Sequence, residues 1–113
     1  MIADSAMEIY QCKLMILHAA FKIDRGDDFR TEVSMAKHFV ANSLNRIIDR
    51  AIQVHGALGY STDTPLAGMA QNARWARFAD GADEIHQMRI AEITIKAFTD
   101  TGSTRTATGD LPI

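Results

Sequence analysis

The chain has 113 residues and a mass of 12.5 kDa, the size of one folding domain, which excludes a multidomain enzyme as the product of this sequence alone. Its 12 basic and 14 acidic side chains give a formal net charge of −2, so it lacks the basic excess with which proteins bind nucleic acids. Cys12 is the only cysteine, which excludes an internal disulfide and favours a reducing compartment. Because no apolar run approaches the ~20 residues that span a bilayer, we expect no transmembrane segment and an intracellular location, in a bacterial cytoplasm or an organelle matrix.

The first segment carries apolar residues at helical spacing. Two adjacent stripes recur at intervals of three, four or seven residues: Met7, Tyr10, Leu14, Leu17 and Phe21, and Ile2, Ile9, Ile16 and Ile23. The spacing predicts a helix over 3–24 with a broad buried face. Gly26 predicts a left-handed end to this helix, and Asp27 and Asp28 are candidate caps for the next one, so a helical hairpin is expected here.

The second segment predicts a longer helix over 28–58. Its apolar residues are again three or four positions apart: Ala36, Val40, Leu44, Ile47, Ala51, Val54 and Leu58. A helix of about thirty residues is about 45 Å long, so we expect it to overhang its neighbours and to leave apolar surface that another chain or domain covers. Gly56 and Gly59 loosen its end.

Two shorter helices follow. Thr64 suits an N-cap and Pro65 the first helical position, which predicts a helix over 65–78. Asp80 and Asp83 have the spacing of a capping box at the start of a helix over 82–99.

No segment alternates with a period of two, so the predicted fold is all-α, an antiparallel helical bundle. We expect residues 1–100 to form the helical domain. Residues 101–113 have too little apolar surface to offset the entropy of ordering them, and we expect a disordered tail there.

Metal and nucleophile sites find little support. The sequence contains one Asp-x-x-His, Asp83 to His86, which has too few ligands for a metal, so no metal is expected. Cys12 lies within a helical pattern and is interpreted as a packing residue.

Two clusters stand out from a generic bundle. Gln53–Tyr60 combines a helix end with two glycines, which either punctuate the helix or let its backbone approach a ligand. Asp80–His86 places three carboxylates within five residues at a helix start, where they either cap the helix or provide a general base beside Gly81. On spacing alone, the structural interpretation is favoured for both clusters.

Read in order, the segments Ala51–Tyr60, Pro65 and Ala79–His86 resemble the C-terminal helical domain of acyl-CoA dehydrogenases. The resemblance includes Ala36-Lys37 and the turn at Gly26, and it covers residues 2–99. The chain is most similar to the branch with Ala-Asp-Gly-x-Asp-Glu-[Val/Ile]-His in place of Tyr-Glu-Gly-Thr.

The resemblance implies an FAD-dependent oxidoreductase of fatty-acid or related acyl catabolism. In this family a carboxylate takes the α-proton of an acyl-CoA thioester, the β-hydrogen leaves as hydride to the flavin, and the electrons pass to an electron-transfer flavoprotein. Asp80 stands where the family carries its catalytic Glu, although it is one methylene shorter, so the resemblance implies Asp80 as the base. Some members place their base on an earlier helix, and a capping role for Asp80 therefore stays open.

The resemblance also implies four cofactor-binding residues. Gln53 and Gly56 match the stretch that contacts the ADP half of FAD from a neighbouring subunit, and Gly81 and Glu84 match positions beside the flavin. Two substitutions weaken the match: Ala57 stands for a glycine, and Ala82 for a threonine that offers a hydroxyl to the flavin.

The family's N-terminal helical and middle β domains, which supply most flavin and CoA contacts, have no counterpart in this sequence. We therefore expect an isolated C-terminal part that binds FAD poorly, lacks dehydrogenase activity by itself and self-associates as a dimer or tetramer. The alternative is a non-catalytic helical oligomerisation module derived from that domain.

Overall fold

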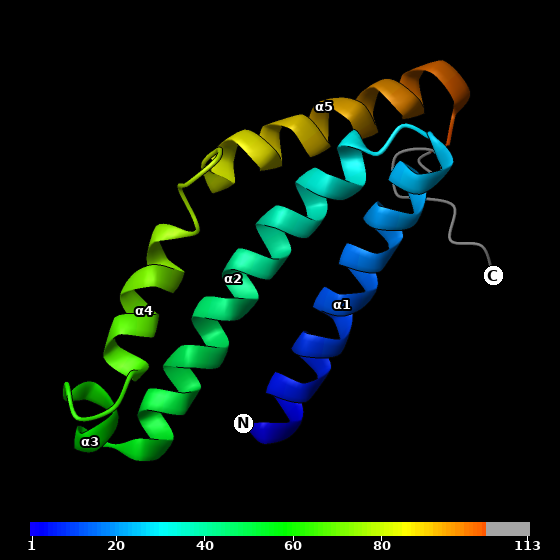
Figure 1. The fold of residues 1–113 in the computed structure, drawn as a ribbon. Coiled ribbons are helices and arrows are strands. Elements are labelled where there is room, and N and C mark those ends of the chain that lie inside the picture. The colour runs from blue at the N-terminus through cyan, green and yellow to red at the C-terminus, as the bar shows by residue number, and fades with distance from the viewer. Residues whose placement is uncertain (104–113) are drawn as a thin grey trace.

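The computed structural model describes residues 1–103, which contain five helices and no strand (Figure 1). The helices are α1 (Ile2–Arg25), α2 (Arg30–His55), α3 (Ala57–Tyr60), α4 (Leu66–Trp75) and α5 (Asp83–Thr101). The predicted all-α fold is confirmed. The expected tail falls mostly on residues 104–113, outside the described residues, so it stays a prediction.

Helix α2 is the centre of the fold. It runs antiparallel to α1 on one side and to α4 on another, while α5 crosses near its N-terminal end (Figure 1). The molecule is elongated, with principal extents of 53 × 28 × 24 Å. Each long helix therefore packs mainly against α2, and much of its remaining surface has no neighbour within the described chain.

The end of α1 follows the prediction, whereas the end of α2 does not. Gly26 adopts φ 74 at the end of α1, and its N–H donates to the carbonyls of Lys22 and Ile23. The second helix ends at His55, three residues before Leu58, because Gly56 has φ 60 and ψ −142, which no α-helix accommodates. Residues Ala57–Tyr60 form the separate turn α3.

The shorter helices also differ from their predicted bounds. Helix α4 ends at Trp75 rather than at 78, and it begins after Pro65 without a side-chain cap. The hydroxyl of Thr64 donates to the carbonyl of Leu58 at 3.4 Å, so it does not cap this helix. Helix α5 extends to Thr101, two residues beyond the predicted end, and Gly102 then closes it in a left-handed conformation.

The face that α1 turns toward α2 is not its most apolar one. Charged pairs determine the orientation: Glu8 accepts from Arg46 and Arg50 at 2.6 Å each, and Lys22 donates to the buried Glu32 at 2.7 Å. The two apolar stripes of α1 are exposed, so the predicted broad buried face is wrong for this chain. Ion pairs and small side chains hold the α1–α2 contact, and no other described element covers the apolar surface of α1.

The core of the described chain is small. Its buried apolar residues are Ala19, Ala36, Ala41, Ile48 and Ala73. The predicted stripe of α2 is only partly inside, because Leu44, Val54 and Leu58 are exposed. Alanine methyls bury little apolar area, so this core contributes little hydrophobic free energy to folding. Within the described residues, no helix is long and apolar enough to cross a membrane.

Candidate functional site

Asp80 lies in a sharp reversal between α4 and α5. Asp80 has φ 53 and Gly81 has φ 98, so two consecutive residues adopt left-handed backbone conformations. Asp80 is the one residue other than glycine with positive φ in the described chain. Aspartate tolerates this region better than most residues, yet it is uncommon, and such conformations concentrate at functional sites. The reversal leaves the carboxylate-bearing residue exposed.

Gly81 has a reason to be glycine within the chain itself. A Cβ at this position would lie 2.9 Å from Nε2 of His86, which is closer than real Cβ contacts allow, and φ 98 disfavours any side chain. Both ring nitrogens of His86 are buried and have no hydrogen-bond partner. The imidazole therefore fills the space beneath Gly81, and the predicted contact of Gly81 with a cofactor stays a prediction.

The predicted capping box at Asp80 and Asp83 is wrong. Helix α5 begins after Ala82, and no side chain makes a cap hydrogen bond there. Asp83 instead turns into the protein, where it is only 4% exposed. The two residues thus have different environments, since Asp80 remains exposed while Asp83 is buried.

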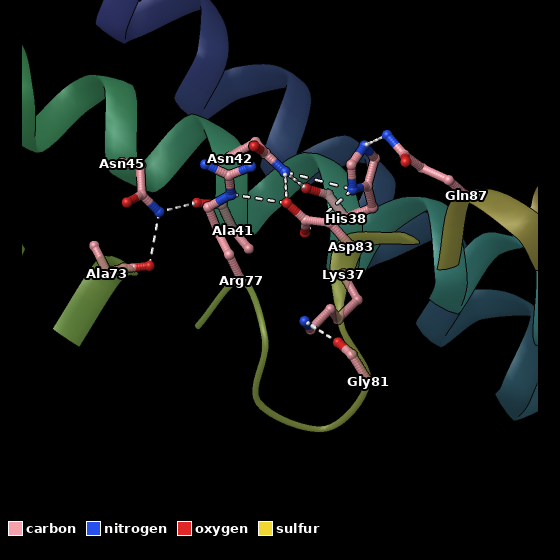
Figure 2. A network of polar contacts seen from close by, with 10 residues as sticks. All are labelled: Lys37, His38, Ala41, Asn42, Asn45, Ala73, Arg77, Gly81, Asp83 and Gln87. Carbon is pink, nitrogen blue, oxygen red and sulfur yellow. Dashed lines mark hydrogen bonds and ion pairs between the residues drawn. The ribbon is translucent and has the colours of Figure 1, made fainter. Parts of the chain in front are cut away.

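Asp83 is the centre of a polar network that joins α2 to the loop before α5 (Figure 2). Its Oδ2 accepts from Nε of Arg77 at 2.7 Å and from Nδ2 of Asn42 at 3.1 Å, and its Oδ1 lies 3.3 Å from Nδ1 of His38. Burial raises the pKa of Asp83, but the hydrogen bonds from Arg77, Asn42 and His38 outweigh it and hold the pKa at about 2. The carboxylate is therefore ionised at neutral pH.

Other α2 side chains extend this network along the helix. Lys37 donates through Nζ to the carbonyl oxygen of Gly81 at 2.7 Å, and Asn45 donates to the carbonyl of Ala73 at 2.7 Å (Figure 2). The amide of Gln87 lies 3.3 Å from Nε2 of His38. This edge of α2 thus makes polar contacts with both α4 and the start of α5.

Sequence reasoning missed the network, although a signal for it was present. His38, Asn42 and Asn45 are spaced by four and three residues, so they share one face of α2. A polar stripe on a helix that must pack against two others predicts buried polar contacts with them. Attention to the apolar stripe alone left this face without a role.

Gln53 and Gly56 lie at the opposite end of α2. Gln53 is exposed, and a Cβ on Gly56 would meet nothing within 4 Å, so the backbone of Gly56 is open to approach. Gly59 is different, because its Cβ would lie 2.8 Å from the Cβ of His55 and from the carbonyl oxygen of Ile52. Gly59 thus allows α3 to fold back on α2, whereas Gly56 faces open space.

The structure does not bring the five predicted site residues together. Lys37 is the α2 residue that contacts Gly81. Gln53 lies sixteen residues further along the same helix, a distance of about 24 Å. Glu84 is exposed in the first turn of α5, on the Asp80 side of this gap. Asp80, Gly81 and Glu84 thus form one group, and Gln53 and Gly56 form a second one.

A groove of about 550 Å³ lies between the start of α2 and α5, where Arg30, Ile85, Met88 and Arg89 are among its lining residues, and it contains none of the predicted site residues. Within residues 1–103, no three His, Cys, Asp or Glu side chains are arranged to hold a metal ion.

Comparison with known proteins gives consistent matches. A family model described as acyl-CoA dehydrogenase, C-terminal domain, matches residues 1–95. Acyl-CoA dehydrogenase family member 10 of Mus musculus is 42% identical over 97 residues, which make up 84% of this chain and 9% of that protein. The (R)-benzylsuccinyl-CoA dehydrogenase of Thauera aromatica is 41% identical over 92 residues, 80% of this chain and 23% of that protein.

A solved structure gives the same result. A protein of Mycobacterium abscessus, described as an acyl-CoA dehydrogenase, matches with a TM-score of 0.83 and 40% sequence identity, over 86% of this chain and 24% of that one. The chain therefore spans less than a quarter of the length of each of these three relatives.

Proposed function

We propose that this chain, which belongs to the acyl-CoA dehydrogenase family, is the C-terminal helical part of an FAD-dependent enzyme that removes two hydrogens from acyl-CoA thioesters. The observation that carries the proposal is that Asp80, which the resemblance matches to the family's base, is an exposed carboxylate in a left-handed turn. An intracellular location, in a bacterial cytoplasm or an organelle matrix, fits the single cysteine.

In this proposal Asp80 takes the α-proton of the thioester. A general base must lie within reach of the proton that it removes, and the exposed carboxylate of Asp80 is accessible to a substrate. The chemistry that bound FAD supplies is acceptance of the β-hydrogen as hydride. The electrons then leave through an electron-transfer flavoprotein, which makes that protein a partner of the complete enzyme.

The described residues fit contacts with FAD at two separate places. The side chains of Gln53 and Glu84 are exposed and form no hydrogen bond with another described residue, so both are free to bind a nucleotide or ribityl hydroxyl. The open backbone at Gly56 suits the approach of the ADP half. Because about 24 Å separates Gln53 from the Asp80 turn, we propose that Gln53 and Gly56 contact FAD bound to a neighbouring subunit.

A second candidate function is a non-catalytic oligomerisation module. The exposed apolar stripes of α1 favour it, because Ile2, Tyr10 and Leu17 are 87%, 64% and 64% exposed. Apolar side chains that gather on one helix in this way mark a surface for another protein chain. In both candidate functions this surface mediates self-association into a dimer or tetramer.

A chimeric enzyme distinguishes the two candidates. In it, this chain replaces the matching segment of the Thauera aromatica (R)-benzylsuccinyl-CoA dehydrogenase. We expect the purified chimera to retain FAD and to lose the visible absorbance of oxidised flavin when (R)-benzylsuccinyl-CoA is added. The same enzyme without the segment is the control. A chimera that folds and assembles but contains no FAD would contradict the catalytic proposal and favour the oligomerisation module.

The chain by itself is expected to bind FAD more weakly than micromolar, since the resemblance assigns only four of its residues to cofactor contacts. Isothermal titration with FAD measures this affinity, and a sub-micromolar dissociation constant would refute the expectation. The complete enzyme is expected to gain its affinity from the other domains and from the neighbouring subunit.

Self-association is expected for the chain at micromolar concentration, because the apolar side chains of α1 are exposed. Light scattering after size exclusion measures the mass. Replacing the exposed Leu17 by glutamate is expected to shift the chain toward a monomer, because a charge in the interface must be desolvated. The matched control Gln11→Glu adds the same charge at an exposed polar position of α1. An unmodified chain that stays monomeric would rule out this surface as the contact.

A further inference from the structure

We propose that Lys37 is a positioning residue of this site: its ammonium group holds the carbonyl of Gly81 and thereby fixes the left-handed turn that carries Asp80. The effect of Lys37 on catalysis rests on the proposed function, because Asp80 takes part in catalysis only if it is the base. Lys37 itself does not touch the reacting atoms in this proposal.

The contact between Lys37 and Gly81 joins distant parts of the chain. The two residues are 44 positions apart, and the bond from Nζ to the carbonyl oxygen is 2.7 Å long and partly buried. A hydrogen bond from a charged donor at this length is among the stronger kinds in proteins. Helix α2 contacts each of the other four helices, so this bond attaches the turn to the central element of the fold.

The turn needs such an attachment. Left-handed backbone at a residue other than glycine is unfavourable and persists only where the surroundings impose it. The ends of the loop are held elsewhere: the N–H of Asp83 donates to the carbonyl of Arg77 at 3.0 Å, and the side chains of Asp83 and Arg77 bond to each other.

Lys37 acts on the middle of the loop. Among the described residues, its bond to Gly81 is the one side-chain hydrogen bond to the backbone of the Asp80–Gly81 pair. The ring of His86 lies against Gly81, where a Cβ would come within 2.9 Å of its Nε2. Gly81 is thus held both by a polar bond and by contact with a ring, and Asp80 is attached to it directly.

Nuclear magnetic resonance on the full chain tests this proposal without flavin or substrate. Replacing Lys37 by methionine keeps the length of the side chain and removes the donor. We expect the amide signals of Asp80, Gly81 and Ala82 to move, and the hydrogen exchange of the Asp83 amide to become about tenfold faster or more. Signals in α1 and the melting temperature should stay near those of the unmodified chain.

Two further variants separate positioning from general stability. Lys37→Arg restores a charged donor and is expected to return the signals and the exchange rate toward those of the unmodified chain. Lys13→Met changes an exposed lysine of α1 that makes no hydrogen bond in the described structure, and it should alter neither. Unchanged signals and exchange at residues 80–83 in Lys37→Met, or equal changes throughout the chain, would overturn the proposal.

If Lys37→Met does not fold, a measurement on the unmodified chain tests the proposal. A nuclear Overhauser contact between the Hε protons of Lys37 and the Hα protons of Gly81 is expected, and its absence would overturn the proposal. These results do not depend on turnover. Inactivity of Asp80 as a base would therefore leave the attachment by Lys37 intact, and failure of the attachment would leave the chemistry of Asp80 open to its own test.

Discussion

Replacing Asp83 by asparagine is expected to lower the free energy of unfolding by about 2–3 kcal/mol at neutral pH. The substitution keeps the shape of the side chain but removes the negative charge, which forms an ion pair with Arg77 and accepts a hydrogen bond from Asn42. Loss of one partner of a buried ion pair costs about 3–5 kcal/mol, and the value here is smaller because Arg77 is 36% exposed and water can solvate it.

The stability contributed by Asp83 has a defined pH dependence. The pKa is about 2 in the folded chain against an ordinary value of 3.8, so the folded state favours the ionised carboxylate. This contribution, about 2 kcal/mol, is complete above pH 3.8 and is lost as the pH falls toward about 2. Urea denaturation at a series of pH values and one protein concentration measures it, and Asp83→Asn should flatten the curve over this range.

The control for Asp83 is its neighbour in the sequence. Glu84→Gln removes the same charge from an exposed residue in the same helical turn, and we expect it to change the free energy of unfolding by less than about 0.5 kcal/mol. An Asp83→Asn variant as stable as this control would show that the network contributes no net free energy. That outcome would place the stability of the α4–α5 junction in the packing of His86 beneath Gly81 instead.

The sequence predicts which residues share a helix face much better than what covers that face. The all-α fold, the hairpin and its end at Gly26 follow from local spacing and from the left-handed conformation that glycine permits. The stripes of α1 exist, but no described residue buries them, so periodicity alone wrongly placed them inside. The side of α1 that packs against α2 is instead the side with charged residues such as Glu8 and Lys22, which form ion pairs with α2.

The Asp80–His86 junction shows the same limit at the candidate site. Asp80 and Asp83 have equal claims as helix caps when only spacing is considered, because a carboxylate near a helix start is favourable in either position. They differ in their hydrogen-bond partners. Arg77 in the loop and Asn42 on α2 donate to the carboxylate of Asp83, whereas no described side chain donates to the carboxylate of Asp80. A contact of this kind depends on the path of the chain in space, which spacing along the sequence does not contain.

Asp80→Asn in the chimera is expected to lower kcat by about 10²–10⁴-fold, the range that general-base catalysis contributes. Asparagine tolerates the left-handed region as well as aspartate does, so the turn at φ 53 should persist and only the proton acceptor is lost. FAD content and thermal stability should therefore stay unchanged. Rates of (R)-benzylsuccinyl-CoA oxidation in stopped flow measure the effect.

Two further variants, Asp63→Asn and Asp80→Glu, test whether the carboxylate of Asp80 is the base. Asp63 is an exposed acid in the loop before α4, and its replacement should leave the rate unchanged. This control shows whether loss of a surface charge alone lowers the rate. Glutamate at position 80 supplies the longer carboxylate usual in the family and should retain turnover, because proton abstraction requires a correctly placed carboxylate of either length. If Asp80→Asn is as active as the unmodified chimera, the base must lie in another part of the enzyme. The left-handed turn would then serve only to reverse the chain between α4 and α5.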